Sequence, residues 1–305
     1  MMNRQLTMLP ALALCAALIA SCAHGETAMK STTPSAAKSS LPSPTDANAS
    51  VPWEVFADTS AAHEQPLSTA PAVKQYAKGD HVVGAYYLNK ETDEEWIEFA
   101  EAGKKVYVPR CDVNRLYPGN APTGDLPYGE ETVNRWFGIP LTYEPSDLVT
   151  LDEKYAAGSK GEYELRKEAS DALAKMLDDA RAEGIDIRVT SAYRAGMRQK
   201  SIYQRNNKKD GPSQRYSAPP GHSEHQLGTT VDLVDAEQKH VFSRQFNETP
   251  QGAWLEENAV NYGFVRSYQL DNIAETGYIS EPWHWRYQGV GNAQKIAAER
   301  RKRGL

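Results

Sequence analysis

The spacing of hydrophobic residues predicts a helix followed by a strand in the second half of the chain. Between residues 165 and 180 the apolar positions recur at helical intervals on one face, and Gly184 stands where such a helix would end. Residues 185–189 then alternate between isoleucine or valine and polar residues, as expected for a strand with one buried face. The pattern therefore predicts a helix packed against a sheet.

Further elements follow in the same region. Thr249 and Pro250 are typical of the first positions of a helix, and Gly263 of a position just beyond its end. Residues 230–234 are predicted to form a strand that presents Asp232. The order helix, strand, loop, helix and strands predicts a compact α+β domain over residues 161–300, with a small antiparallel sheet flanked by helices.

The first half of the chain has a different pattern. Residues 82–88, 95–100 and 105–108 read as short strands separated by turn residues. The segment 71–115 resembles a bacterial SH3-like β-barrel, and either of two roles is open to it, wall binding or packing against the next domain. Residues 116–160 are rich in proline and glycine and are predicted to be a connecting segment.

The N-terminus has the features of an export signal. Arg4 precedes an apolar stretch, residues 6–20, that is too short to span a bilayer. Small residues then lead into Cys22, which resembles a bacterial lipobox, so residues 1–21 are predicted to be a signal peptide and Cys22 the lipidated residue. Ordinary cleavage nearby, for instance after Gly25, is the alternative. Residues 22–70, rich in Ala, Ser, Thr and Pro, are predicted to be a flexible tether.

Charge and cysteine content narrow the function classes. The 305 residues have a formal net charge of -6, so nucleic acid is not an expected partner, because phosphate binding needs clustered Lys and Arg. The basic run 300–303 follows a helical pattern and is interpreted as a solvated helix end. Without the signal peptide and a lipidated Cys22, Cys111 remains alone, so no internal disulfide is expected.

Two short segments contain residues suited to metal chemistry. The first, Gly-His-Ser-Glu-His-Gln-Leu-Gly-Thr-Thr-Val-Asp, contains His225 and Asp232, and the second, Glu-Pro-Trp-His, contains Glu281 and His284. Two imidazoles and one carboxylate are a catalytic zinc set with an open fourth position, because structural zinc sites are closed by four protein ligands. We therefore predict one zinc ion held by His225, Asp232 and His284, with Glu281 exchanging protons with a water molecule there.

A third segment contains an arginine suited to binding substrate. Arg194 lies at the exit of the strand predicted at residues 185–189, within Ser191-Ala-Tyr-Arg, and Gln199 follows five residues later. A guanidinium at such a position can bind a carboxylate or polarise a carbonyl oxygen.

Together these segments resemble the zinc metallopeptidases of the VanY-type D-alanyl-D-alanine carboxypeptidase family, whose shared fold is often called LAS-type. The family pattern is Ser-x-Tyr-Arg-x4-Gln, then Ser-x-His-x6-Asp, then Glu-x-x-His. The chain fills it in order with Ser191, Tyr193, Arg194, Gln199, Ser223, His225, Asp232, Glu281 and His284. The resemblance implies that Arg194 and Ser223 recognise or polarise the C-terminal end of the substrate. For Gln199 a substrate role and a structural role are both open.

The resemblance implies an exported enzyme that removes the terminal D-alanine from D-Ala-D-Ala ends of peptidoglycan stem peptides. It would be a lipoprotein of the cell envelope, attached to a membrane through Cys22 and facing the periplasm at the outer membrane if the host has one. Alternatives with the same zinc site are an L,D-carboxypeptidase and a stem-peptide endopeptidase. A non-catalytic wall-binding protein is the alternative from another class, and the presence of Glu281 beside a full ligand set argues against it.

Overall fold

The computed structural model describes residues 50–115, 128, 133–136, 138–158, 162–211 and 214–304. The predicted signal peptide, the lipidation site Cys22 and the predicted tether up to residue 49 lie outside the described residues. Across the described part of the chain, no helix has both the length and the apolar character needed to span a membrane.

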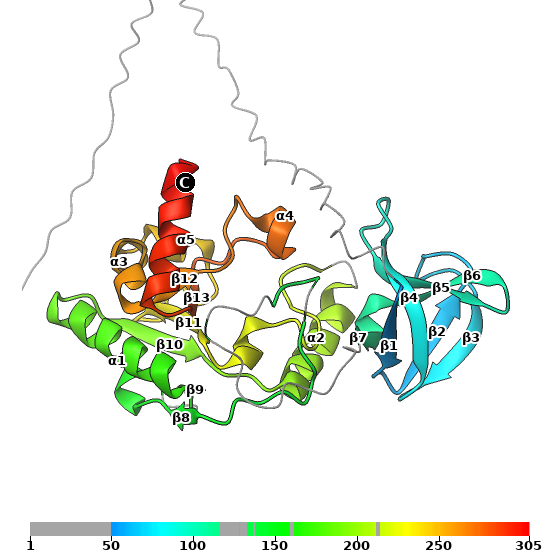
Figure 1. Cartoon of the computed structure of the whole chain (residues 1–305), viewed down its shortest axis with the longest axis horizontal. Coiled ribbons are helices and arrows are strands. Elements are labelled where there is room, and N and C mark those ends of the chain that lie inside the picture. Colours follow the sequence, from blue (N-terminus) through cyan, green and yellow to red (C-terminus); the bar gives the residue numbers. More distant parts are fainter. Residues whose placement is uncertain are drawn as a thin grey trace, which may run out of the picture. The chain divides into compact units, whose positions relative to one another are not determined.

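Residues 51–115 form a seven-stranded antiparallel sheet (Figure 1). Its strand order is β3-β2-β6-β5-β4-β1-β7, with Trp53, Val55, Ile97, Val108 and Val113 among its buried core residues. The strands are β1 (Val51–Val55), β2 (Thr59–His63), β3 (Ala72–Ala77), β4 (His81–Leu88), β5 (Glu95–Glu101), β6 (Lys104–Pro109) and β7 (Val113–Arg115). The three strands expected from alternation are present, whereas the resemblance to an SH3-like barrel remains a prediction.

The predicted tether is too long at its C-terminal end. The sequence predicts a flexible segment up to residue 70, but the structure places β1 and β2 within it. Trp53 and Val55 are almost completely buried, and β1 pairs with both β4 and β7. The polar composition of residues 22–50 hid these strands, and the partners of β1, which are β4 and β7, lie farther along the chain.

The C-terminal half is built on a four-stranded antiparallel sheet of order β10-β11-β13-β12. This arrangement confirms the predicted α+β class with a small antiparallel sheet and flanking helices. The strands are β10 (Ile187–Ser191), β11 (Thr230–Asp235), β12 (Phe264–Arg266) and β13 (His284–Tyr287). The α-helices are α1 (Lys167–Ala182), α2 (Gly196–Asp210), α3 (Pro250–Asn258), α4 (Ile273–Thr276) and α5 (Val290–Lys302).

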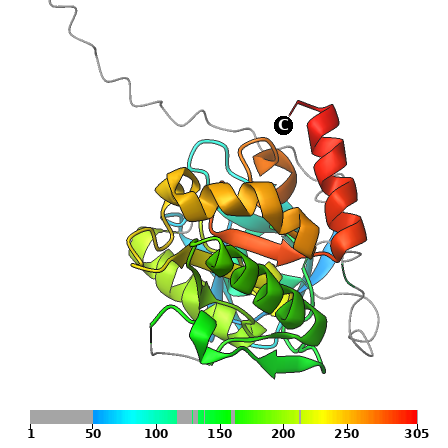
Figure 2. The ribbon, with the colours of Figure 1, turned by 90° about the vertical axis from the view of Figure 1, so that its left-hand side faces the viewer.

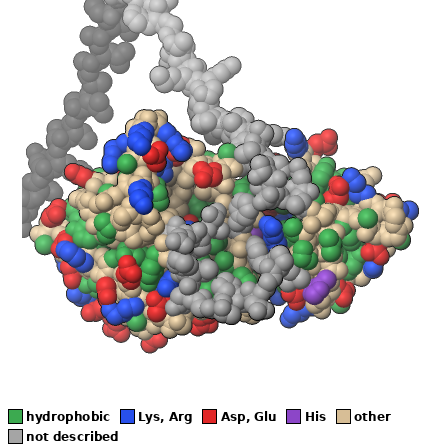
Figure 3. Space-filling view, viewed as in Figure 1, with side chains coloured by type: hydrophobic (Ala, Val, Ile, Leu, Met, Phe, Trp, Pro, Cys, Tyr) green, Lys and Arg blue, Asp and Glu red, His purple; other side chains and the backbone are tan. Residues whose placement is uncertain are grey.

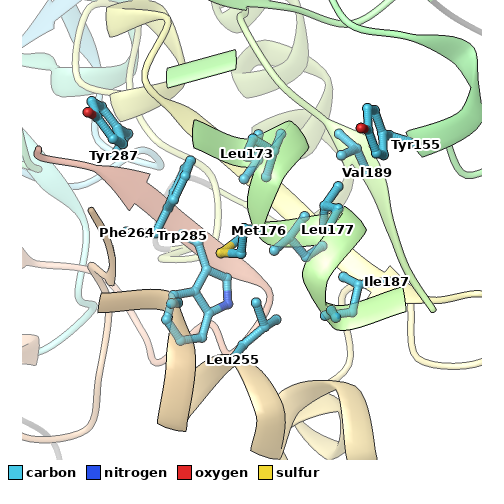
Figure 4. Packing of buried hydrophobic residues seen from close by; sticks show 14 of the residues in the cluster. Tyr155, Leu173, Met176, Leu177, Ile187, Val189, Leu255, Phe264, Trp285 and Tyr287 are labelled. Carbon is cyan, nitrogen blue, oxygen red and sulfur yellow. The ribbon is translucent and has the colours of Figure 1, made fainter. Parts of the chain in front are cut away.

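One face of this sheet is buried by α1 and α3, which lie over it in Figure 2. Figure 4 shows Leu173, Met176 and Leu177 of α1 packed toward Trp285 of β13, with Leu255 of α3 beside them. Side chains alternate along a strand, so the residues next to these core positions point to the opposite face. That opposite face of β11 and β13 carries the polar residues described below.

Two local elements differ from the expectation. Helix α2 occupies a region predicted as loop, because its sequence is strongly polar and gives little helical periodicity. The predicted connecting segment 116–160 also contributes structure: β8 (Leu148–Thr150) pairs with β9 (Glu164–Arg166), and Tyr155 is buried in the main core. By contrast, Thr249 caps α3 through its side chain, as its position predicts.

The basic run at the end of the chain lies in the last turn of α5, where Figure 3 shows Lys and Arg side chains gathered. Arg300 pairs with Asp271 and Lys302 with Glu299. Cations complement the carbonyl end of a helix, and the charges of Arg300 and Lys302 are partly neutralised by these two carboxylates. The cluster is therefore a helix end, as expected.

A buried ion cluster joins the N-terminal sheet to the C-terminal half, with which it forms one compact unit. Glu95 of β5 accepts hydrogen bonds from Arg135 at 2.8 and 2.5 Å and from the Tyr86 hydroxyl at 2.8 Å. Arg215 Nη1 also lies 2.8 Å from its carboxylate. Burial alone raises the pKa of Glu95, but Arg135 and Arg215 lower it to about 2.

We predict that Glu95→Gln lowers the free energy of unfolding at pH 7 by about 3 kcal/mol, because it leaves the buried guanidinium of Arg135 and the partly buried one of Arg215 without this counterion. Since the pKa of Glu95 is lower in the folded than in the unfolded protein, its contribution is present above about pH 4.5 and lost as the pH falls toward 2. The difference between wild type and variant in urea denaturation should therefore shrink on acidification. Glu64→Gln, which breaks an exposed ion pair, is the control, and an equal effect there would contradict the prediction.

Candidate active site

Three predicted ligands, His225, Asp232 and His284, come together in the structure. One ligand atom from each lies within 4.8 Å of the other two, and all three residues are buried. Asp232 of β11 and His284 of β13 are directly opposite in neighbouring antiparallel strands, which puts their side chains on the same face. His225 arrives from the short 3-10 helix Glu224–Leu227, which ends at Gly228 in a left-handed conformation (φ 69°) before β11 begins.

The orientation of His225 is set by its second ring nitrogen. Nδ1 lies 2.7 Å from the carbonyl oxygen of Ala192 and donates to it, while Nε2 lies 3.2 Å from Asp232 Oδ2. With Nδ1 protonated, Nε2 carries the lone pair that a metal ion needs. A register shift in β10 between Val189 and Ser191 brings this part of the strand opposite Asp232.

His284 is held in the same way by a carboxylate. Its Nε2 lies 2.9 Å from Glu224 Oε2, and its Nδ1 lies 3.2 Å from Asp232 Oδ1. Glu224 also accepts a hydrogen bond of 2.9 Å from Arg286, and the Tyr268 ring stacks on the imidazole with centroids 4.4 Å apart. Because Nε2–H of His284 donates to Glu224, its Nδ1 faces Asp232 and His225. This arrangement is typical of metal-ligating histidines.

The electrostatic field around His225, Asp232 and His284 favours the binding of a cation. Burial lowers the pKa of His284, but hydrogen bonds to Asp232 and Glu224 raise it to about 10. Burial raises the pKa of Glu224, but Arg286 and His284 lower it to about 2. The carboxylates thus stay charged beside the two imidazoles. Two histidines and one carboxylate, buried among negatively charged side chains, are suitable ligands for a zinc ion.

Glu281 lies at the edge of this cluster. Its Oε2 is 3.7 Å from His284 Nδ1, farther than the Asp232 carboxylate, and it is not one of the three clustered ligands. Burial raises the pKa of Glu281 to about 8, although His284 lowers it, and the charge of Asp232 contributes to the increase. A carboxyl group that titrates near neutrality can accept a proton and return it.

Arg194 reaches the same site from the loop after β10. Its Nη1 donates to Gln199 Oε1 at 2.7 Å and its Nη2 to Ser191 Oγ at 2.9 Å, and Nη2 lies 3.9 Å from Asp232 Oδ2. Gln199, on α2, in turn donates to the carbonyl oxygen of Ala218 at 2.6 Å. Gln199 thus holds the guanidinium in place, which is a structural role, while it also lines the cavity.

A cavity of about 590 Å³ opens over these groups. Ser223, Arg194, Gln199 and Glu281 line it together with the three clustered ligands. Its volume lies in the range of sites that enclose drug-sized ligands. All the residues predicted for metal binding, proton transfer and substrate binding therefore border one space.

The loop that leads into this cluster contacts the N-terminal sheet. His222, three residues before His225, is fully enclosed, and its Nε2 accepts from Arg110 Nη2 at 2.8 Å. Its Nδ1 donates to the carbonyl oxygen of Asn134 at 2.9 Å. Burial and the neighbouring Arg110 lower the pKa of His222 well below its usual value, so it is a neutral structural residue. The N-terminal sheet therefore supports the segment that carries Ser223, Glu224 and His225.

Sequence reasoning missed Glu224, Arg286 and Tyr268. A signal for Arg286 was available, because it stands two residues after His284 in a strand and must share its face. Glu224 follows Ser223 directly within the motif, but nothing local shows that its carboxylate reaches β13. Tyr268 lies in a loop whose approach to His284 depends on the tertiary fold.

Comparison with known proteins bears on this site. Residues 162–290 match the VanY family, described as D-alanyl-D-alanine carboxypeptidase. The chain is 32% identical over 176 residues to the bifunctional D-Ala-D-Ala dipeptidase and D-Ala-D-Ala carboxypeptidase VanXYC of Enterococcus gallinarum, covering 56% of this chain and 88% of that one. The chain belongs to the VanY family. As a member of the VanY family it has the motif residues of that family gathered around one cavity.

Other VanY-like proteins match over the same region. YodJ of Bacillus subtilis (strain 168) is 37% identical over 167 residues, and the alignment covers 54% of this chain and 61% of YodJ. A solved structure of the LdcB LD-carboxypeptidase, reported for the molecular basis of peptidoglycan recognition, superposes with a TM-score of 0.52 at 36% identity, covering 55% of this chain and 79% of that one. The chain thus spans about three fifths of the length of YodJ.

Proposed function

We propose that the protein is a zinc-dependent carboxypeptidase that hydrolyses the C-terminal D-Ala–D-Ala bond of peptidoglycan stem peptides. The observation that carries this proposal is the buried cluster of His225, Asp232 and His284, with Glu281 and Arg194 bordering the same cavity. Membership of the VanY family and the named activities of VanXYC support the choice of substrate.

His225 Nε2, Asp232 and His284 Nδ1 would hold the zinc ion. A bound zinc ion would supply Lewis acidity and lower the pKa of a water molecule to about 7. Glu281 accepts the proton of the attacking water and returns it to the nitrogen of the leaving D-alanine. Glu281 lines the same cavity as the three clustered residues and lies 3.7 Å from His284 Nδ1, within reach of both transfers.

Arg194 is placed to act on the substrate. Ser191 and Gln199 fix its guanidinium plane, so less side-chain entropy is lost when a planar anion binds. It binds either the terminal carboxylate or the carbonyl oxygen of the scissile bond, and Ser223 lies in the same cavity for a hydrogen bond to that end. A grip on a free carboxylate restricts cleavage to the C-terminal residue.

One further activity has specific support. The similarity to the LdcB LD-carboxypeptidase, at 36% identity, favours cleavage of tetrapeptides between an L-centre of the third residue and the terminal D-alanine. The zinc site and proton transfers are identical for the two bonds, so the difference lies in the cavity wall.

Digestion of synthetic stem peptides by the zinc-loaded protein, followed by mass spectrometry, tests the proposal. We predict loss of one D-alanine from the pentapeptide and an intact tetrapeptide. Loss of D-alanine from the tetrapeptide instead would identify an L,D-carboxypeptidase, and a cut within the stem an endopeptidase. No cleavage of any peptide would contradict an enzymatic function.

We also propose that the protein is exported and attached to a membrane by a lipid on Cys22, with the enzyme facing the periplasm at the outer membrane if the host has one. This part of the proposal depends on the lipobox-like residues before Cys22, which lie outside the described residues. The mass of the mature N-terminal peptide tests it, and a mature chain that begins beyond Cys22 would contradict it.

A further inference from the structure

The cavity is lined by two arginines that the proposed catalysis does not use. Arg205 lies on α2, on the side of the helix where Gln199 and Ile202 also border the cavity, and Arg244 follows the loop after β11. Both side chains are exposed. Within the described residues, neither guanidinium forms a salt bridge or hydrogen bond.

The acidic side chains that line the cavity belong to the catalytic cluster. The two carboxylates among its lining residues are Asp232 and Glu281, and both belong to the catalytic cluster. Arg205 has the Tyr216 hydroxyl as an electrostatic neighbour, and that hydroxyl is itself bonded to Asp210. An exposed arginine is ordinarily solvated, but two that border one cavity without an acidic partner create a positive field there.

The loop that carries Arg244 also holds a strained aromatic residue that lines the cavity. Phe242 is 56% exposed and has a left-handed backbone (φ 51°), which is unfavourable for a bulky residue. Its ring meets Trp283, with centroids 6.0 Å apart. Asp235 holds the loop in this conformation by accepting from the backbone of Lys239 and His240. The loop thus presents an apolar ring and a cation together at the cavity.

We propose that Arg205 and Arg244 form a subsite for a carboxylate of the substrate that lies N-terminal to the scissile bond. This rests on the proposed peptidase function, and it defines the substrate as an acidic peptide. Arg194 is already held beside the catalytic cluster, so a second carboxylate bound by Arg205 and Arg244 would fix the peptide at two points along the cavity. A planar guanidinium fork matches a carboxylate, and the Tyr216 and Phe242 rings offer apolar contact to the peptide between the two points.

Two carboxylates of a stem peptide fit this chemistry, one on the second residue and one on the third. Four synthetic pentapeptides distinguish these two carboxylates as substrates of the zinc-loaded protein. They carry D-glutamate or its amide at the second position, each combined with meso-diaminopimelate or L-lysine at the third position. The double variant Arg205→Ala/Arg244→Ala should lower kcat/KM roughly tenfold, mainly through KM, on the peptides that carry the recognised carboxylate. Its effect on peptides lacking that group should stay within about twofold.

Charge reversal makes the test sharper. Arg244→Glu should shift the preference toward the peptide in which the carboxylate is replaced by an amide or by L-lysine. Arg301→Ala, which removes an exposed arginine from α5 outside the cavity, is the matched control and should change no peptide's kcat/KM. If the variants lost kcat/KM equally on all four peptides, or on none of them, the proposed subsite would be overturned. Cleavage of the peptides would still support the proposed peptidase function.

The subsite can also be judged without turnover. If wild type cleaves none of the peptides, the proposed function fails, and binding of the four peptides to the zinc-loaded Glu281→Gln protein by calorimetry still decides the subsite. About tenfold tighter binding of the peptides with the carboxylate, lost in Arg205→Ala/Arg244→Ala, supports it. Equal affinity for all four peptides would overturn it.

Discussion

Removal of the metal ion should abolish peptidase activity, and zinc should restore it. His225, Asp232 and His284 are the three clustered ligands, and without the Lewis acid the water has no comparable source of activation. We expect dialysis against a chelator to reduce cleavage to background, and about one equivalent of zinc to recover it. Elemental analysis of the same samples measures the zinc.

Ligand variants extend this prediction. His225→Ala and His284→Ala should each lose zinc and activity together, because two protein ligands bind the ion far more weakly than three. His81→Ala is the matched control, since this histidine is exposed on β4 and lies outside the cluster. Full activity in protein that elemental analysis shows to be metal-free would refute the mechanism.

Glu281→Gln should keep zinc but lower kcat by about 10²- to 10⁴-fold, the usual contribution of a positioned general base. Glutamine preserves the size of the side chain, but it cannot accept the proton of water or return it to the leaving amine. Zinc should remain because Glu281 is not one of the three clustered ligands and lies 3.7 Å from His284 Nδ1.

Parallel measurement of kcat and bound zinc distinguishes a chemical from a structural role of Glu281. Glu257→Gln, an exposed glutamate of α3, is the control and should leave both quantities unchanged. Loss of zinc from Glu281→Gln would show that Glu281 is a ligand, and an unchanged kcat would show that it is not the base.

The role of the N-terminal sheet was open between wall binding and packing. The structure favours packing, because Arg110 bonds His222 and Glu95 pairs with Arg135 and Arg215 across the junction. Both contacts are buried, and His222 lies three residues from the ligand His225. We infer that this sheet stabilises the segment carrying the ligands, whatever else its outer surface binds.

Much of the catalytic half was predictable because its signals are local. Alternation along residues 185–189 predicted β10, residues 230–234 were predicted as the strand that presents Asp232, which is β11, and the apolar face of residues 165–180 predicted α1. The type of metal site also follows from residue chemistry, since imidazole and carboxylate side chains at these spacings suit zinc. These features depend on residues close together in the chain.

Other features depend on contacts between distant segments, and only the tertiary structure decided them. Helix α2 is too polar for its periodicity to show, yet it carries both Gln199 and Arg205 to the cavity. The bond from His284 to Glu224 spans 60 residues, and that from Arg110 to His222 spans 112. A sequence pattern reports which face of an element is buried, but it does not report which side chain from elsewhere meets it. The three residues predicted as ligands could therefore be named from the sequence, whereas the groups that orient them, and the sheet that supports their loop, followed only from the packing of the whole chain.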